Sequence, residues 1–103
     1  MRIIYKYKIK SIVDIYDGNL DRYELVIPSG SKILSCAIQR NSDVCVWVEQ
    51  DFVTTEKTTM EHYAIEFAGT GWPLHNMEKY NFLNTILINE GEYVYHVYYR
   101  LLP

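Results

Sequence analysis

The sequence has only two cysteines, Cys36 and Cys45, and it lacks a long apolar run. Both cysteines fall in expected strands, and a register centred on residues 41–42 would place them nearly opposite, where a disulfide would need strained geometry. We therefore expect two buried free thiols. No apolar run approaches the ~18 residues of a membrane-spanning helix, and the first residues lack the apolar segment of a signal peptide. These absences predict a soluble intracellular protein with no membrane partner.

A strong excess of one charge is also missing, since the formal net charge is -3. Arg2, Lys6, Lys8 and Lys10 form only a local basic stripe. Four of the ten tyrosines could stack on bases, namely Tyr5, Tyr7, Tyr95 and Tyr99, but proteins that bind single strands normally combine such rings with a basic groove. Nucleic acid is therefore not an expected partner.

No catalytic or metal-binding motif is present. The three histidines, His62, His75 and His96, are too dispersed for close metal-ligand spacing, and the cysteines do not form a Cys-x-x-Cys pair. His96 lies between Tyr95 and Val97, where we expect a core or cross-strand histidine with a satisfied ring nitrogen.

Several carboxylates cluster near the first turn and could be imagined as an acid–base pair: Asp14, Asp17, Asp21 and Glu24. A solvated turn explains them equally well. We expect no catalytic residues, no metal, no cofactor and no enzymatic activity.

A β-hairpin is the clearest feature that the sequence does contain. Residues 82–88 and 93–99 are dense in β-branched and aromatic residues, and they flank the polar, glycine-bearing link 89–92. Apolar residues on both faces predict that this hairpin lies inside a sheet and not along its rim.

Period-two alternation recurs along the rest of the chain. Residues 3–10 alternate apolar side chains with lysines, which favours a half-exposed strand at a sheet edge. Further strands are expected at 22–27, with Tyr23, Leu25 and Ile27 on one face, and around 63–67. A second hairpin joins 33–39 to 44–49, and the expected inner faces are Leu34, Cys36 and Ile38 on its first strand and Val44, Val46 and Val48 on its second.

Three segments are less regular. Residues 12–16 could form a short strand or an excursion, 50–59 read as an exposed loop or a long hairpin tip, and 74–79 support at most one helical turn. About seven short strands without helical crossovers predict an all-β fold, either an antiparallel β-sandwich or a small partly open barrel. We expect a single all-β domain over residues 1–103, and a small sheet protein with many aromatics and sheet edges is expected to form a homo-oligomer.

Five segments in this order resemble a known family: 4–7, 30–35, 69–73, 82–85 and 94–98. The family consists of proteins of roughly 100 residues encoded mainly by tailed bacteriophages and prophages, and its function is unknown. Asn84 stands where the family usually has a glycine, and Trp72 where a histidine is frequent. The resemblance implies a phage setting, and hence the cytoplasm of an infected bacterial host, but no reaction.

The candidate binding site is the turn Gly69, Thr70, Gly71 and Trp72, with His75 and Tyr80 nearby in sequence. Its glycines suggest a tight turn, and Trp72 could either plug the end of the core or act as an exposed anchor for a partner. Two functions are therefore expected: a binding protein that inhibits a host factor such as a defence-system protein, or a protein that sequesters a small ligand, for example a nucleotide signal, at a turn or subunit interface.

Overall fold

The computed structural model describes residues 1–11, 22–40, 42–52, 54–74, 77–88 and 90–103. All regular secondary structure in this part of the chain is β-strand, so the predicted all-β class is confirmed. The strands are β1 (Arg2–Ser11), β2 (Tyr23–Pro28), β3 (Lys32–Gln39), β4 (Asp43–Asp51), β5 (Met60–Gly69), β6 (Asn81–Ile88) and β7 (Tyr93–Leu101). Every strand pair is antiparallel.

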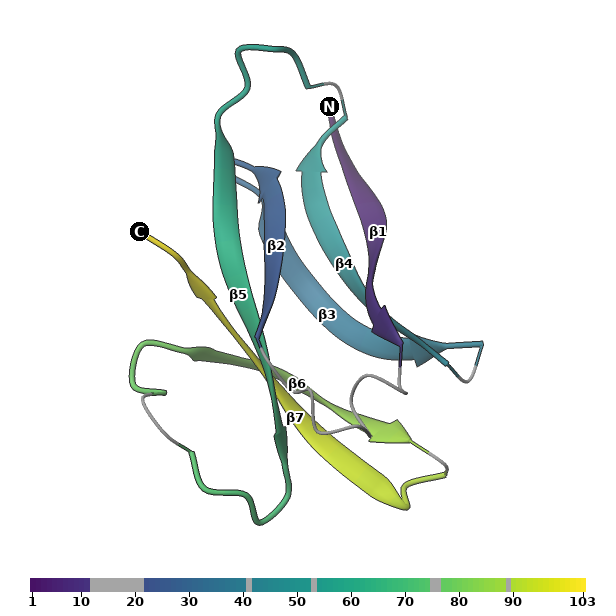
Figure 1. Cartoon of the computed structure of the whole chain (residues 1–103). Coiled ribbons are helices and arrows are strands. Elements are labelled where there is room, and N and C mark those ends of the chain that lie inside the picture. Colours follow the sequence, from purple (N-terminus) through teal and green to yellow (C-terminus); the bar gives the residue numbers. More distant parts are fainter. Residues whose placement is uncertain (12–21, 41, 53, 75–76, 89) are drawn as a thin grey trace.

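The strands form two sheets, which have the orders β1-β4-β3 and β2-β5-β7-β6 (Figure 1). Their inner faces share one hydrophobic core, so the arrangement is the predicted sandwich. Among the described strands no backbone ladder joins the two sheets, so these strands do not form a closed barrel. The edge strands β3 and β6 nevertheless lie beside each other.

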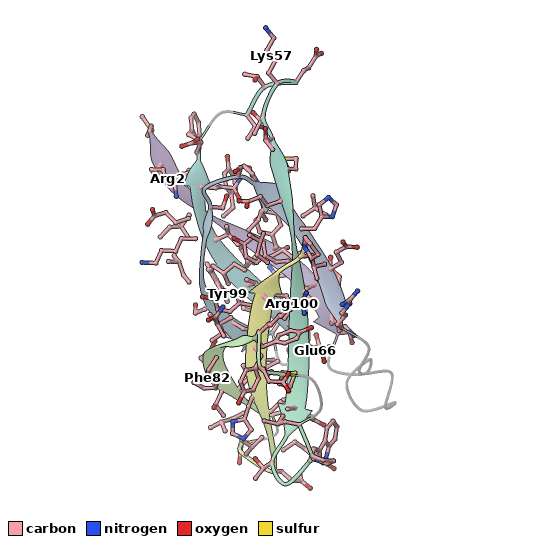
Figure 2. The ribbon with its side chains drawn as sticks, turned by 90° about the vertical axis from the view of Figure 1, so that its left-hand side faces the viewer. Arg2, Lys57, Glu66, Phe82, Tyr99 and Arg100 are labelled. Carbon is pink, nitrogen blue, oxygen red and sulfur yellow. The ribbon has the colours of Figure 1, made fainter. Side chains whose placement is uncertain are left out.

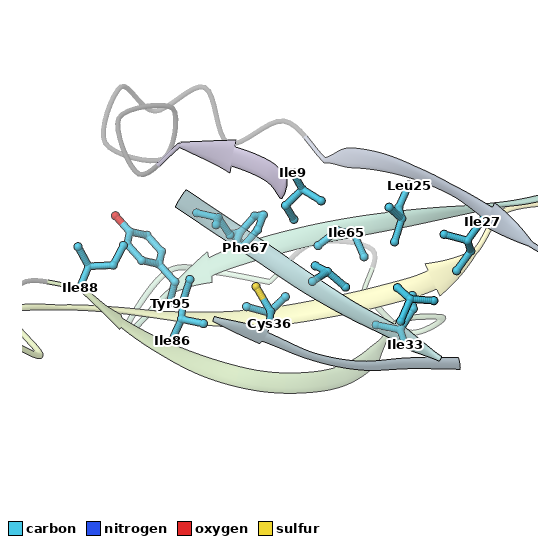
Figure 3. Close-up of a cluster of buried hydrophobic side chains, with 14 residues drawn as sticks. Ile9, Leu25, Ile27, Ile33, Cys36, Ile65, Phe67, Ile86, Ile88 and Tyr95 are labelled. Carbon is cyan, nitrogen blue, oxygen red and sulfur yellow. The ribbon is translucent and has the colours of Figure 1, made fainter. Parts of the chain in front are cut away.

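The core contains side chains from every strand (Figure 3). Val44, Val46 and Val48 are fully buried in β4, as the alternation predicted. Leu25 and Ile27 are buried in β2, and Tyr23 packs against the same cluster. Burial of each such aliphatic side chain contributes about 1.5–3 kcal/mol, so this shared interior is what holds the two sheets together.

The structure corrects the predicted inner face of β3. Its pairing with β4 shifts by one residue between Ile33 and Ser35, which is a β-bulge. Because a bulge reverses the alternation, Ile33 and Cys36 enter the core, whereas Leu34 is only half-buried.

The two cysteines are buried free thiols, as predicted. However, Cys36 lies opposite Val46, and Cys45 lies opposite Ala37. The pairing is thus displaced by one residue from the predicted register, and neighbouring residues along a strand point to opposite faces. Cys36 belongs to the core cluster, and Cys45 does not.

A side-chain amide connects the two sheets where β3 and β6 meet. The Cys36 backbone N–H donates to Asn84 Oδ1, and Asn84 Nδ2 donates to the Cys36 carbonyl, both at 2.8 Å. Asn84 therefore satisfies both backbone groups of an edge residue, as a neighbouring strand would.

The predicted C-terminal hairpin is present, but the prediction that it lies inside a sheet holds for only one of its two strands. β7 lies inside the four-stranded sheet, between β5 and β6, whereas β6 is an edge strand. Phe82 and Leu87 of β6 are more than half exposed, at 56% and 60%. Apolar residues on both faces of β6 are therefore not evidence that both faces are buried.

The other edge prediction is correct, because the lysine-bearing β1 ends the three-stranded sheet. Residues 12–16 lie outside the described part of the chain. Gln50 and Asp51, which were expected in the next loop, still belong to β4, and Gln50 is buried. Residues 54–59 are mostly exposed, as expected of a loop, but they are not a hairpin tip, since β4 and β5 belong to different sheets (Figure 1). Within the described residues, no helix has the length and apolar character needed to cross a membrane.

Candidate functional site

The predicted turn lies at the end of β5 and is tied to β7. The Trp72 N–H donates to the Gly69 carbonyl at 3.0 Å, and Gly71 has a φ of 87°. A positive φ at the third position is what a type II turn requires, and glycine adopts it without strain. The Thr70 N–H also donates to the Val94 carbonyl at 3.3 Å, which fixes the turn against the neighbouring strand.

Trp72 packs directly on the backbone of Gly69. A Cβ atom placed on Gly69 would lie 2.5 Å from Cε2 of the indole, so only glycine leaves room for the ring in this position. The ring also makes an edge-to-face contact with Tyr95, at 5.8 Å between centroids and an interplanar angle of 81°. Such pairs contribute about 0.5–1.5 kcal/mol beyond area burial.

Trp72 is nevertheless 46% exposed, and it is outside the core cluster. The residue is therefore held in place from one side and open to solvent on the other. This geometry favours the anchor interpretation over the core plug.

Together with other described residues, the indole lines a groove and a smaller pocket. A groove of about 420 Å³ is lined by Gly69, Thr70, Trp72, Glu92, Tyr93, Val94 and Tyr95. A smaller pocket of about 190 Å³ is lined by Glu66, Phe67, Ala68, Trp72, Pro73, Leu74 and Met77. The groove thus lies between the β5 turn and the start of β7, and Trp72 lines both the groove and the pocket.

Tyr80 is not part of either hollow. Its hydroxyl donates to Glu66 Oε1 at 3.4 Å, and the Arg100 guanidinium carbon lies 5.7 Å from its ring centroid. Figure 2 shows Glu66 and Arg100 close together on adjacent strands. Tyr80 therefore contacts the rim of the smaller pocket through Glu66 and through its backbone N–H, which donates to the Met77 carbonyl at 3.0 Å. His75, the remaining predicted site residue, lies outside the described residues.

His96 connects the turn to β6. Its Nε2 is 2.9 Å from Thr70 Oγ1, and its Nδ1 is 3.0 Å from Thr85 Oγ1. Both ring nitrogens thus have hydroxyl partners, which confirms the predicted cross-strand role. Thr70 consequently serves to position the turn, since its backbone N–H and its hydroxyl are both bonded to β7.

A family model described as a domain of unknown function, DUF7352, matches residues 1–102. The chain belongs to this family. The resemblance seen in the sequence therefore agrees with the family in its unknown function. Comparison of this DUF7352 protein with curated proteins and with solved structures gives no match.

The sequence of this DUF7352 protein did not reveal that residues around the start of β7 line the groove. Glu92, Tyr93 and Tyr95 come from the hairpin link and its second strand, about twenty residues after the turn. The register that places Gly69 opposite Tyr95 brings them to Trp72. That register depends on β5 pairing with β7, and alternation within a strand does not specify its neighbour.

No metal centre emerges from the described parts of the chain, where no group of three or more histidine, cysteine or acidic side chains could hold an ion. Asp14, Asp17 and Asp21 lie outside those parts. Glu24 lies on β2 and pairs with His62 of β5 at 3.0 Å, and both side chains are about half exposed. The contact between Glu24 and His62 is therefore solvated, and it contributes at most about 1 kcal/mol to stability.

Proposed function

We propose that this chain is a non-enzymatic, phage-encoded binding protein that attaches to a host factor, such as a defence-system protein, through the surface around Trp72. The resemblance to proteins of tailed phages motivates the phage setting and the cytoplasm of an infected bacterium as its place of action. The observation that carries the proposal is an exposed indole that the fold already holds in one position.

The energetic argument concerns what Trp72 loses on binding. Tryptophan is enriched among residues that dominate interface energies. Immobilising a mobile side chain on binding costs about 0.5–1.5 kcal/mol, and the packing on Gly69 and Tyr95 has already removed most of that freedom. A partner that covers the ring therefore gains its contact area at little entropic cost.

The groove beside Trp72 supports a second candidate, the sequestering of a small ligand such as a nucleotide signal. Its volume of about 420 Å³ falls within the ~300–1,000 Å³ range of small-molecule sites, and the indole offers a stacking surface. The groove would hold such a ligand between the turn and the β7 hairpin.

We also propose that the protein forms a homo-oligomer. Edge strand β6 exposes the apolar side chains Phe82 and Leu87, and the Phe82 ring packs edge-to-face on Tyr98 of β7. Apolar residues on an edge strand favour association with a second copy.

The test is recovery of tagged protein from infected or transformed bacteria, followed by native mass spectrometry. The first candidate expects a co-purifying host protein that Trp72→Ala loses, whereas the second expects a retained small mass that the same change removes. Phe52→Ala is the matched control, because Phe52 is a similarly exposed aromatic directly after β4. Equal loss of the bound partner or small mass in both variants, or its retention by Trp72→Ala, would refute a binding site at Trp72.

A further inference from the structure

The charge of the groove beside Trp72 restricts what can enter it, provided that the groove is the binding site proposed above. Glu92 is the one charged side chain among the described residues that line it. The side chain is exposed, and within the described chain its carboxylate makes no ion pair. Glu90, in the same hairpin link, is also exposed and adds a second negative charge nearby. The field at this mouth therefore attracts cations and repels phosphates.

Aromatic rings add to the attraction of the groove for cations. Trp72 and Tyr93 are 46% and 41% exposed, and Tyr95 is buried behind them. The face of each ring carries the negative end of the ring quadrupole, which favours a cation placed over it. A carboxylate beside several aromatic rings is thus complementary to a positively charged group with apolar or planar surface.

We propose that the groove binds the guanidinium of an arginine side chain presented by the partner protein. A guanidinium is planar, stacks on aromatic faces and is weakly hydrated, so it loses less hydration on entering an aromatic groove than an ammonium does. It can also donate two parallel hydrogen bonds to one carboxylate, here that of Glu92. The same chemistry disfavours the nucleotide of the second candidate function, whose phosphates would face Glu92.

The test uses short peptides as probes, with ¹⁵N-labelled protein followed by two-dimensional NMR. The probes are acetyl-Gly-Arg-Gly-amide, its citrulline analogue, which is nearly isosteric but neutral, and adenosine monophosphate. Titration extends to about 10 mM, because recognition of a single side chain in an open groove gives only millimolar affinity. We expect the arginine peptide to shift the Trp72 indole N–H and the amides of residues 92–95, and the other two probes to leave them unchanged.

Variants of the protein assign the effect to the groove. Glu92→Gln should weaken arginine-peptide binding about threefold, since an exposed ion pair is lost. Trp72→Ala should weaken it about tenfold, because the stacking surface is lost. Glu56→Gln is the matched control, as it removes the same charge from the exposed loop that carries Lys57, at the far end of the molecule in Figure 2, and should leave binding unchanged.

Equal shifts with the arginine and citrulline peptides, no shift with either, or shifts with adenosine monophosphate would overturn this proposal. These outcomes are separate from those that test the proposed function. A partner lost on Trp72→Ala but unaffected by Glu92→Gln would leave the binding site standing and reject arginine as its anchor. A partner retained by Trp72→Ala would reject both.

Discussion

At the scale of single residues, Gly69 determines where the Trp72 ring can lie. We predict that Gly69→Ala displaces the indole, because the added methyl group would lie 2.5 Å from Cε2. Gly69 has no positive φ, so the backbone can accept alanine and the ring, at the surface, can swing away. The indole N–H resonance should shift, and binding of the partner should weaken about as much as in Trp72→Ala. An unchanged indole environment would contradict the packing described above.

Trp72 itself should matter little for folding. Because the residue is 46% exposed, we expect Trp72→Ala to lower the free energy of unfolding by about 0.5–1 kcal/mol, which moves the melting temperature by only a few degrees. Phe67→Ala should cost about 3–5 kcal/mol, since Phe67 is only 4% exposed and lies in the core. Thermal melts of the two variants measure the difference. A Trp72→Ala loss as large as that of Phe67→Ala would place the ring in the core after all.

Cys36 predicts a pH dependence of stability. Burial, with Cys45 nearby, raises the pKa of the Cys36 thiol from 9.0 to about 12. Between these pH values the unfolded chain loses this proton and the folded chain keeps it. The stabilisation from this group is therefore fully present below pH 9 and is lost as the pH rises. At pH 10 the loss from this group should be about 1 kcal/mol.

Urea denaturation of the wild type and of Cys36→Ala between pH 7 and 10 would isolate this contribution. Tyr63, whose pKa is raised by burial and by Glu61 and Tyr99, is present in both proteins and cancels in the comparison. We expect the variant to be less stable at pH 7 but to lose less stability on going to pH 10. Parallel pH profiles would show that the Cys36 thiol titrates alike in the folded and unfolded chains.

At the scale of strands, the side-chain amide of Asn84 replaces a missing neighbour of β3. We expect Asn84→Ala to lower the free energy of unfolding by about 2 kcal/mol, because it leaves the Cys36 N–H and carbonyl without their partner. Asn84→Asp should be at least as harmful, since it places an oxygen against the Cys36 carbonyl. Asn81→Ala, at the exposed start of the same strand, should change stability by less than about 0.5 kcal/mol. Equal effects at the two positions in urea denaturation would argue against the connection.

Alternation predicted the inner face of most strands, because a half-buried strand must separate apolar from polar side chains with period two. It failed at Ile33 and Leu34, where a bulge inserts a residue without a turn signal in the sequence. The prediction that β6 lies inside the sheet came from its apolar residues on both faces, and such residues look alike whether or not something covers them. The turn at Gly69 was readable from its glycines and Trp72. The groove was not, because it needs the pairing of β5 with β7.

At the scale of the whole molecule, we predict self-association. The exposed Phe82 and Leu87 lie on an edge strand, where a second copy could cover them. Light scattering at micromolar concentration should give at least twice the monomer mass, and the double change Phe82→Ser with Leu87→Ser should return it to 12.2 kDa. The exposed Phe52→Ser is the control and should leave the assembly intact. A monomeric wild type would refute the prediction.

The position of β7 has a consequence for the order in which the sheet can be completed. β7 is the last strand along the chain, yet it occupies the interior of its sheet and holds β5 and β6 together. A nascent chain interrupted before Tyr93 would contain β6 without a ladder partner in that sheet, and β5 would expose the edge that β7 normally covers. Such an intermediate would resemble the acceptor in donor-strand complementation. We therefore expect a synthetic peptide of residues 93–101 to bind the truncated chain.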